Sequence, residues 1–200
     1  VCSEPEEGNP IYTDPHAPKT LAIKAFSQAV KYKPDYVHAY YNRGTAKKDI
    51  GMDTLATKPD YGKQILNEAL ADFDKALKLD NKFVEAYHNR GIVKENLGDL
   101  EGAIKDYSKG LEIRPEMYKL YSSRGVAKGK AKRLEEAIKD FNKSLAIKPD
   151  NPEAYSNRGF AKVQLGKLEE GIKDYNKSLQ LEPNSTEALY NRAIARFNTG

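Results

Sequence analysis

Residues 86–115 read AYHNRGIVKENLGDLEGAIKDYSKGLEIRP, and residues 154–183 read AYSNRGFAKVQLGKLEEGIKDYNKSLQLEP. The two stretches share the segments NRG, LG and IKDY at identical spacings, and Gly91, Gly125 and Gly159 follow one another at intervals of 34 residues. A fixed period of this length is typical of a chain built from stacked copies of one supersecondary unit. The sequence therefore predicts a repeat protein and not a domain with one central core.

Each copy contains two segments in which apolar residues recur at helical spacing. Tyr87 and Val93 belong to the first segment of one copy, and Ala103 and Tyr107 belong to its second segment. Gly98 lies between them and favours a tight turn, and a proline ends the second segment because it cannot continue a helix. A pair of helices with two apolar sides buries them only against neighbouring pairs, so the copies should stack into a solenoid.

The unit resembles the tetratricopeptide repeat, a helix-turn-helix unit of 34 residues. The positions that carry the resemblance are an aromatic residue, two small residues, a second aromatic residue and a closing proline: Tyr87, Gly91, Ala103, Tyr107 and Pro115; Tyr121, Gly125, Ala137, Phe141 and Pro149; Tyr155, Gly159, Gly171, Tyr175 and Pro183. The resemblance covers the chain from about Ala22 to the C-terminus. It implies an all-α fold, a right-handed α-solenoid of tetratricopeptide helix-turn-helix repeats whose first helices line a concave groove.

The register of the repeats predicts the organisation of the chain. We expect an extended or disordered acidic arm at 1–17 and a solenoid over 18–200. The solenoid begins with an unpaired helix at 18–33 and ends with an unpaired first helix at 186–198. Between them lie four repeats, at 37–83, 84–117, 118–151 and 152–185. The first repeat spans 47 residues, 13 more than the period of 34, because of an insertion at 52–64. The final helix has no second helix after it, so we expect the natural chain to continue beyond Gly200.

The insertion lies between the two helices of the first repeat. Both helices are expected to gain nearly two turns, with Asp60 capping the second one. The hairpin would then project beyond its neighbours and be dispensable for folding. An irregular surface loop is the alternative.

Two basic positions recur in every copy where the family pattern has leucine and tyrosine. They are Arg43 and Lys47, Arg90 and Lys94, Arg124 and Lys128, Arg158 and Lys162, and Arg192 and Arg196. The second helices of the four repeats offer matching carboxylates, at Asp72, Asp106, Asp140 and Asp174. Because a half-buried cation needs a partner, we expect a ladder of Arg–Asp pairs between packed helices. A basic stripe that binds an anionic ligand is the alternative.

No motif indicates reaction chemistry. The histidines His16, His38 and His88 lack the spacing of a metal-binding helix motif, and residues 125–133, GVAKGKAKR, lack the spacing of a phosphate loop. The one cysteine, Cys2, cannot form an internal disulfide or a cysteine zinc site. We therefore expect no enzyme, with no catalytic residues, no metal and no cofactor.

Charge and hydropathy limit the class of partner. The net charge is +4, and lysines and glutamates are interspersed along the chain. No apolar run approaches the roughly 18 residues that a membrane span needs. We expect a protein or peptide partner, no nucleic acid and no membrane span, and a cytoplasmic location is only slightly favoured.

In the geometry that the resemblance implies, the residues just before the arginines point into the groove. They are Asn42, Asn89, Asn157 and Asn191, and Ser123 interrupts the row. An amide donates and accepts, so such a row can bind successive peptide groups of an extended ligand, as an asparagine ladder does in some members of this family. The alternative is that these residues only solvate the groove. Variable neighbouring positions would contact side chains of the ligand: Tyr41, His88, Ile92, Phe160 and Tyr190.

Some members of the family clamp the carboxylate tail of heat-shock chaperones with a Lys and an Asn in one first helix. Here those positions hold Tyr41 and Thr45, or His88 and Ile92, so the clamp is absent. The predicted function is a protein-protein interaction scaffold that binds a partner protein or extended peptide in its groove. The alternatives are a regulatory or substrate-recruiting region of a larger enzyme, and a scaffold that self-associates through its open C-terminal helix.

Overall fold

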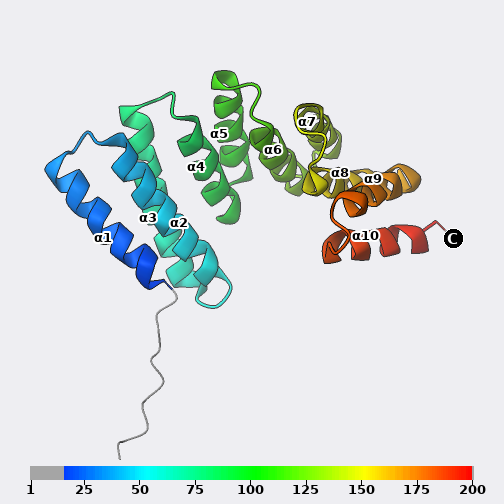
Figure 1. Cartoon of the computed structure of the whole chain (residues 1–200), viewed down its shortest axis with the longest axis horizontal. Helices are drawn as coiled ribbons and strands as arrows, with labels where there is room; N and C mark the ends of the chain where they lie inside the picture. The colour runs from blue at the N-terminus through cyan, green and yellow to red at the C-terminus, as the bar shows by residue number, and fades with distance from the viewer. Residues whose placement is uncertain (1–15, 200) are drawn as a thin grey trace, which may run out of the picture.

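The computed structural model describes residues 16–199, so the arm expected at 1–17 lies almost wholly outside the described residues. The helices of the described part are α1 (Ala17–Tyr32), α2 (Val37–Leu55), α3 (Pro59–Leu79), α4 (Val84–Asn96), α5 (Leu100–Ile113), α6 (Tyr118–Lys130), α7 (Leu134–Ile147), α8 (Pro152–Gln164), α9 (Leu168–Leu181) and α10 (Thr186–Phe197). They lie side by side in chain order along an arch (Figure 1). The predicted helical repeat solenoid is confirmed.

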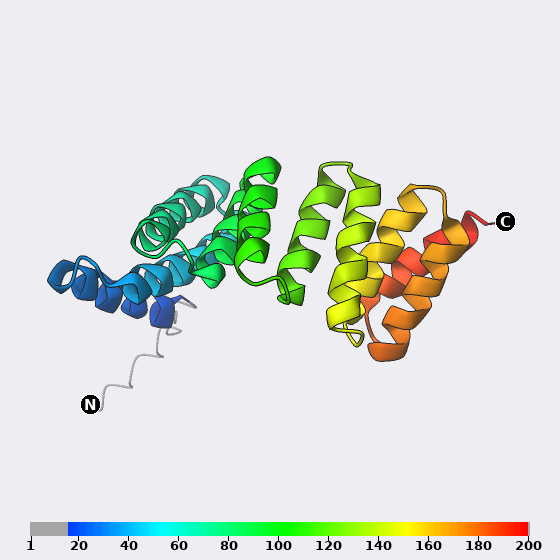
Figure 2. The ribbon, with the colours of Figure 1, turned by 90° about the horizontal axis from the view of Figure 1, so that it is seen from above.

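The helices pack as antiparallel hairpins, α2 with α3, α4 with α5, α6 with α7 and α8 with α9, which succeed one another along the long axis (Figure 2). The first helices α2, α4, α6, α8 and α10 also approach one another in order to within 8 Å between Cα atoms, whereas no two second helices within residues 16–199 come that close. The side on which successive helices lie closer together is the inner side of a curved array. We call this surface, formed by the first helices, the concave face.

A buried aromatic ring closes each hairpin. Tyr107 of α5 is 0% exposed, and a Cβ placed on Gly91 of α4 would overlap its ring. Phe141 of α7 lies against Gly125 of α6 in the same way. Because protein interiors are close-packed, the small residue of the first helix sets how closely the two helices approach.

The turn inside each of the three regular hairpins ends its first helix with a residue in the left-handed region. Gly98 and Gly166 have φ of 90° and 77°, and Lys132 occupies the equivalent position with φ of 63°. In all three turns the next amide bonds a carbonyl five residues earlier, as from Arg133 to Lys128 at 2.9 Å. The left-handed region costs an L-residue with a side chain roughly 1–2 kcal/mol, so Lys132 is strained.

We expect Lys132→Gly to stabilise the protein by about 1 kcal/mol, because glycine removes that strain at some entropic cost. The free energy of unfolding in urea measures the effect. The reciprocal control is Gly98→Lys in the equivalent turn, which should destabilise by a similar amount. Equal stabilities of all three proteins would contradict the strain.

The expected Arg–Asp ladder is confirmed in the four repeats. In one of them, Arg90 donates from Nε and Nη2 to both carboxylate oxygens of Asp106, at 2.8 and 2.6 Å. Asp106 is 3% exposed, and the Nζ of Lys94 lies 2.9 Å from its Oδ2. The same trio recurs as Arg43, Lys47 and Asp72; Arg124, Lys128 and Asp140; and Arg158, Lys162 and Asp174. The lysines are therefore part of the ladder, and the alternative of a ligand-binding basic stripe is not supported.

The remaining guanidinium nitrogen of each arginine reaches the second helix of the preceding unit. Nη1 donates from Arg43 to Ser27, from Arg90 to Asp74, from Arg124 to Ser108, from Arg158 to Asn142 and from Arg192 to Asn176. The acceptor always lies 16 residues before the arginine. In the four repeats one guanidinium therefore joins three helices.

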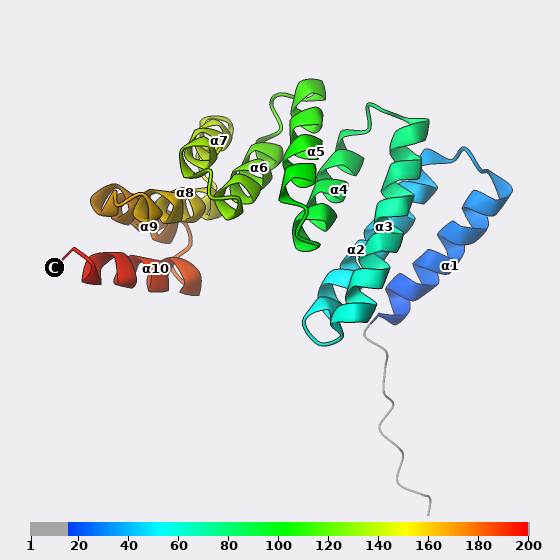
Figure 3. The same cartoon turned by 180° about the vertical axis from the view of Figure 1, so that it is seen from behind.

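The first hairpin is longer than the others. α2 and α3 have 19 and 21 residues, against 13 and 14 in α4 and α5, and their turn passes the ends of α4 and α5 (Figures 1 and 3). The extra turns are not isolated, because Thr54 and Gly62 are buried and Lys19 of α1 pairs with Asp53 at 2.7 Å. The expected gain of nearly two turns in each helix and the projection beyond α4 and α5 are confirmed, whereas the alternative of an irregular loop is wrong; on its other side the extension is covered by α1.

The expected cap of α3 is also wrong. Lys58 is the N-cap residue, Pro59 begins the helix, and Asp60 lies within the first turn and makes no side-chain cap bond. Proline is favoured at the first helical position because the amide that it lacks would have no partner there. The carboxylate of Asp60 still lies at the end of the helix where the helix dipole favours negative charge.

We expect Asp106→Ala to destabilise the protein by roughly 3–5 kcal/mol, because it leaves Arg90 and Lys94 half-buried without their carboxylate. Asp74→Ala is the matched control. It removes the exposed partner of the same arginine and should cost about 1 kcal/mol or less. Urea unfolding of both variants measures the difference, and equal costs would show that the buried pair is not the stabilising one.

Candidate functional site

Two adjoining pockets lie on the concave face, and both are lined by Val126 of α6. Pocket 1 has a volume of about 370 Å³ and runs from α4 to the start of α8. Pocket 2 has a volume of about 310 Å³ and lies between α6, α8 and α10. Together they form a groove across successive first helices.

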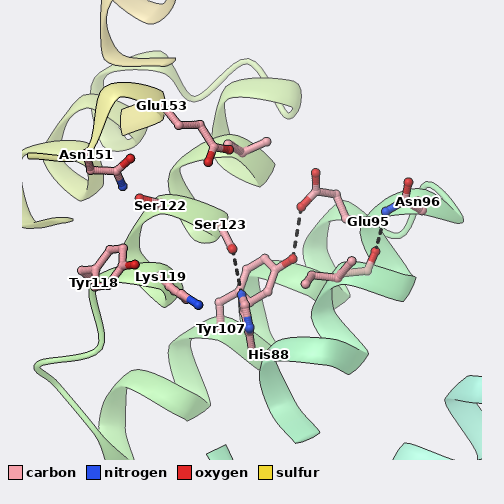
Figure 4. A pocket seen from close by; sticks show the side chains of 12 residues that line it. His88, Glu95, Asn96, Tyr107, Tyr118, Lys119, Ser122, Ser123, Asn151 and Glu153 are labelled. Carbon is pink, nitrogen blue, oxygen red and sulfur yellow. Dashed lines mark hydrogen bonds between the residues drawn. The ribbon is translucent and has the colours of Figure 1, made fainter. Parts of the chain in front are cut away.

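Four polar side chains of pocket 1 bond to one another in two pairs (Figure 4). His88 Nε2 lies 3.0 Å from the hydroxyl of Ser123, and the hydroxyl of Tyr107 donates to Glu95 at 3.1 Å. Glu95 also pairs with Lys130 at 2.7 Å. Burial, with the charge of Glu95, raises the pKa of Tyr107 above its ordinary value, so this hydroxyl stays protonated and donates.

His88 is neutral at the floor of this pocket. Burial lowers its pKa from the ordinary 6.5 to about 4, and the charges of Lys119 and Lys48 act in the same direction. The folded state therefore binds this proton less well than the unfolded state does. The stability that His88 contributes as a neutral ring is complete above pH 6.5 and falls as the pH drops towards 4.

We expect the wild type to lose about 2–3 kcal/mol more stability than His88→Gln between pH 7 and pH 4.5, since a shift of one pKa unit corresponds to about 1.4 kcal/mol. Urea unfolding at the two pH values measures the loss. His38→Gln, which changes an exposed histidine, is the control and should follow the wild type. Identical pH dependence in His88→Gln would show that His88 is not buried neutral.

Pocket 2 has a largely apolar lining with a few polar side chains. Its apolar lining comes from three helices: Val126, Leu134, Phe141, Phe160 and Ala161. The side chains of Asn157, Asn191, Lys130 and Glu187 complete it. The amides of Asn157 and Asn191 make no hydrogen bond to any other residue in 16–199, so their donors and acceptors are available to a ligand.

The structure divides the expected binding residues into four groups. His88 and Ile92 line pocket 1, and Asn157, Phe160 and Asn191 line pocket 2. Tyr41 and Asn89 bond to each other instead, because the amide of Asn89 donates to the hydroxyl of Tyr41 at 3.1 Å and to Thr45 at 3.3 Å. Asn42 and Tyr190 are exposed and line neither pocket.

The expected row of four free asparagines is therefore interrupted at Asn89, which is 9% exposed. Its amide bonds Tyr41, which lies in the first helix of the preceding repeat and 48 residues earlier in the chain. Repeat register assigns a residue to a face but does not reveal such a partner.

Sequence reasoning missed Gly129, which lines pocket 2. The signal was available, because the equivalent residues one period before and after are Glu95 and Val163. A glycine at a position where both neighbouring repeats carry a larger residue indicates space. Whether a neighbouring helix fills that space cannot be read from the register of the repeats.

Within residues 16–199, no group of three or more His, Cys, Asp or Glu is placed to hold a metal ion. In the same part of the chain, every helix is too short or too polar to cross a membrane.

Comparison with family models and solved structures places the fold among known repeats. A model described as TPR repeat matches residues 61–98, 130–166 and 161–200, and one described as Tetratricopeptide repeat matches residues 84–117. No curated protein sequence matches the chain.

Solved structures of similar fold include that of MamA, with a TM-score of 0.72 and 23% identity over 88% of this chain and 99% of that one. The structure of YrrB, described as a TPR protein with an unusual peptide-binding site, has a TM-score of 0.66 and 21% identity over 88% of this chain and 84% of that one. The structure of the first TPR of Spaghetti (RPAP3), bound to the HSP90 peptide SRMEEVD, has a TM-score of 0.58 and 32% identity over 60% of this chain and 95% of that one.

Proposed function

This chain belongs to the tetratricopeptide repeat family, and we propose that it is an interaction scaffold that binds an extended peptide segment of a partner protein in its concave groove. The ligand lies across pockets 1 and 2, which share Val126 in their linings. Its main chain is bound by amide side chains, and its side chains enter the pockets.

The observation that carries this proposal is the pair of unbonded amides beside an apolar pocket. Asn157 and Asn191 are equivalent residues one period of 34 apart, and both line pocket 2. Each amide can donate to a peptide carbonyl and accept from a peptide N–H. Apolar anchors surrounded by polar groups are the usual arrangement at peptide-binding surfaces.

The bound peptide in the structure of the first TPR of Spaghetti (RPAP3) supports a peptide as the class of ligand. The present chain differs in the groove residues that would clamp a chaperone tail, since it has Tyr41 and Thr45, or His88 and Ile92, at those positions. We therefore propose a peptide other than a chaperone carboxylate tail.

Self-association is a second candidate, favoured by exposed apolar side chains on α10. Leu189, Ile194 and Phe197 are 42%, 44% and 84% exposed. Head-to-tail stacking of α10 on α1 of a second copy would, however, leave Arg192 without a carboxylate, because Ala25 occupies the register position that holds aspartate in α3, α5, α7 and α9. Peptide binding is therefore the proposal that we favour.

The test uses a library of random 12-residue peptides displayed on phage and selected on the immobilised protein. Selected peptides are synthesised, and their dissociation constants are measured by calorimetry. We expect Asn157→Ala with Asn191→Ala to weaken binding about fivefold or more, since each hydrogen bond contributes roughly 0.5–1.5 kcal/mol.

Asn67→Ala with Asn81→Ala is the matched control, because it removes two exposed asparagines outside both pockets. Both double variants should melt at the wild-type temperature. Unchanged affinity in the first double variant would remove the asparagines from the proposed site.

A further inference from the structure

Gly129 occupies a position where glycine has no structural use. It lies in the last turn of α6 with an ordinary backbone conformation, and the left-handed residue of that turn is Lys132. Glycine is less favourable in a helix than alanine, by up to about 1 kcal/mol. The equivalent residues Glu95 and Val163 show that the repeat accepts a side chain here.

The missing side chain opens pocket 2. A Cβ placed on Gly129 would meet no atom within 4 Å, so nothing from a neighbouring helix fills the space. That space is continuous with the lining formed by Phe141 and Phe160, and Phe160 is itself 48% exposed. The last turn of α6 thus forms a concave wall where the other first helices carry a side chain.

We propose that pocket 2 binds one large uncharged apolar side chain of the peptide, leucine, isoleucine, methionine or an aromatic residue, and that Gly129 is the specificity determinant that admits it. This inference rests on the proposed function, because the anchor belongs to the peptide that Asn157 and Asn191 bind.

The charges around the pocket disfavour an acidic anchor, and its largely apolar lining favours an uncharged one. The amine of Lys130 is already paired with Glu95 at 2.7 Å, so it is not free to neutralise an acidic side chain. An acidic side chain placed between Phe141 and Phe160 would lose its hydration without a free cationic partner, and the carboxylate of Glu187, which lines the same pocket, would repel it. An apolar side chain gains from the same burial, whereas the peptide groups beside it bond to the two asparagines.

Gly129→Leu is the blocking variant. Leucine is preferred to valine because Val163 is accommodated by Gly171 in its own repeat, whereas the repeat of Gly129 has Ala137 at that position. Glu95, which is unbranched at Cβ, is compatible with Ala103 in the equivalent place. The thermal unfolding temperature should therefore not fall.

The probe is the same random 12-residue phage library, selected in parallel on the wild type and on Gly129→Leu. We expect peptides selected on the wild type to share a large apolar residue at one position, and Gly129→Leu to bind them about tenfold or more weakly. Phe160→Ala, which removes an exposed wall of the pocket, should weaken the same peptides. Ala146→Leu adds a leucine to α7 outside both pockets and should bind them as the wild type does.

The outcomes separate the two proposals. Peptides that bind the wild type and Gly129→Leu equally, or that share no apolar position, overturn the anchor pocket while groove binding stands. Failure of the library to yield any peptide on the wild type counts against both.

Discussion

The structure depends on one buried carboxylate in each repeat that is shared by two cations. Asp106 accepts from Arg90 and Lys94, and neither cation could lie half-buried between helices without it. Arg90 also lies over the ring of Tyr87, at 5.5 Å from its centre. Packing of the rings brings the helices together, but the carboxylate decides which face of each helix meets which partner.

This arrangement has a direct effect on the concave face. In the four repeats the recurrent arginines and lysines are directed to carboxylates between the helices. Four further carboxylates add to the four aspartates, so the positive charge is largely neutralised there: Glu68, Asp74, Glu136 and Glu170. What remains along the groove is apolar surface, with amide and hydroxyl side chains and single charges of both signs, such as Lys119, Glu153 and Glu187 beside the pair of Glu95 and Lys130. A surface of this kind suits a peptide better than an anionic polymer.

The sequence predicts the periodic features well and the irregular ones poorly. The solenoid, its turns and the pairing of Arg90 with Asp106 follow from register, because equivalent residues meet equivalent partners in every copy. The fate of Asn89 and the space at Gly129 do not, since each depends on a contact, or its absence, in one copy only. The cap expected at Asp60 is wrong for a related reason, because Pro59, which occurs in this copy only, fixes where α3 begins.

The hydrogen bond from each recurrent arginine to the preceding unit also bears on how such a chain lengthens in evolution. The carboxylate that it needs lies within its own repeat, whereas its acceptor in the preceding unit is serine, asparagine or aspartate. A duplicated repeat therefore carries the aspartate that its arginine requires. At the junction with the preceding unit, the same arginine donates to any of three types of polar residue. The arginine contact therefore does not oppose the insertion of whole units, and the groove can extend one repeat at a time where the contacts particular to one junction, such as that of Asn89 with Tyr41, are also satisfied.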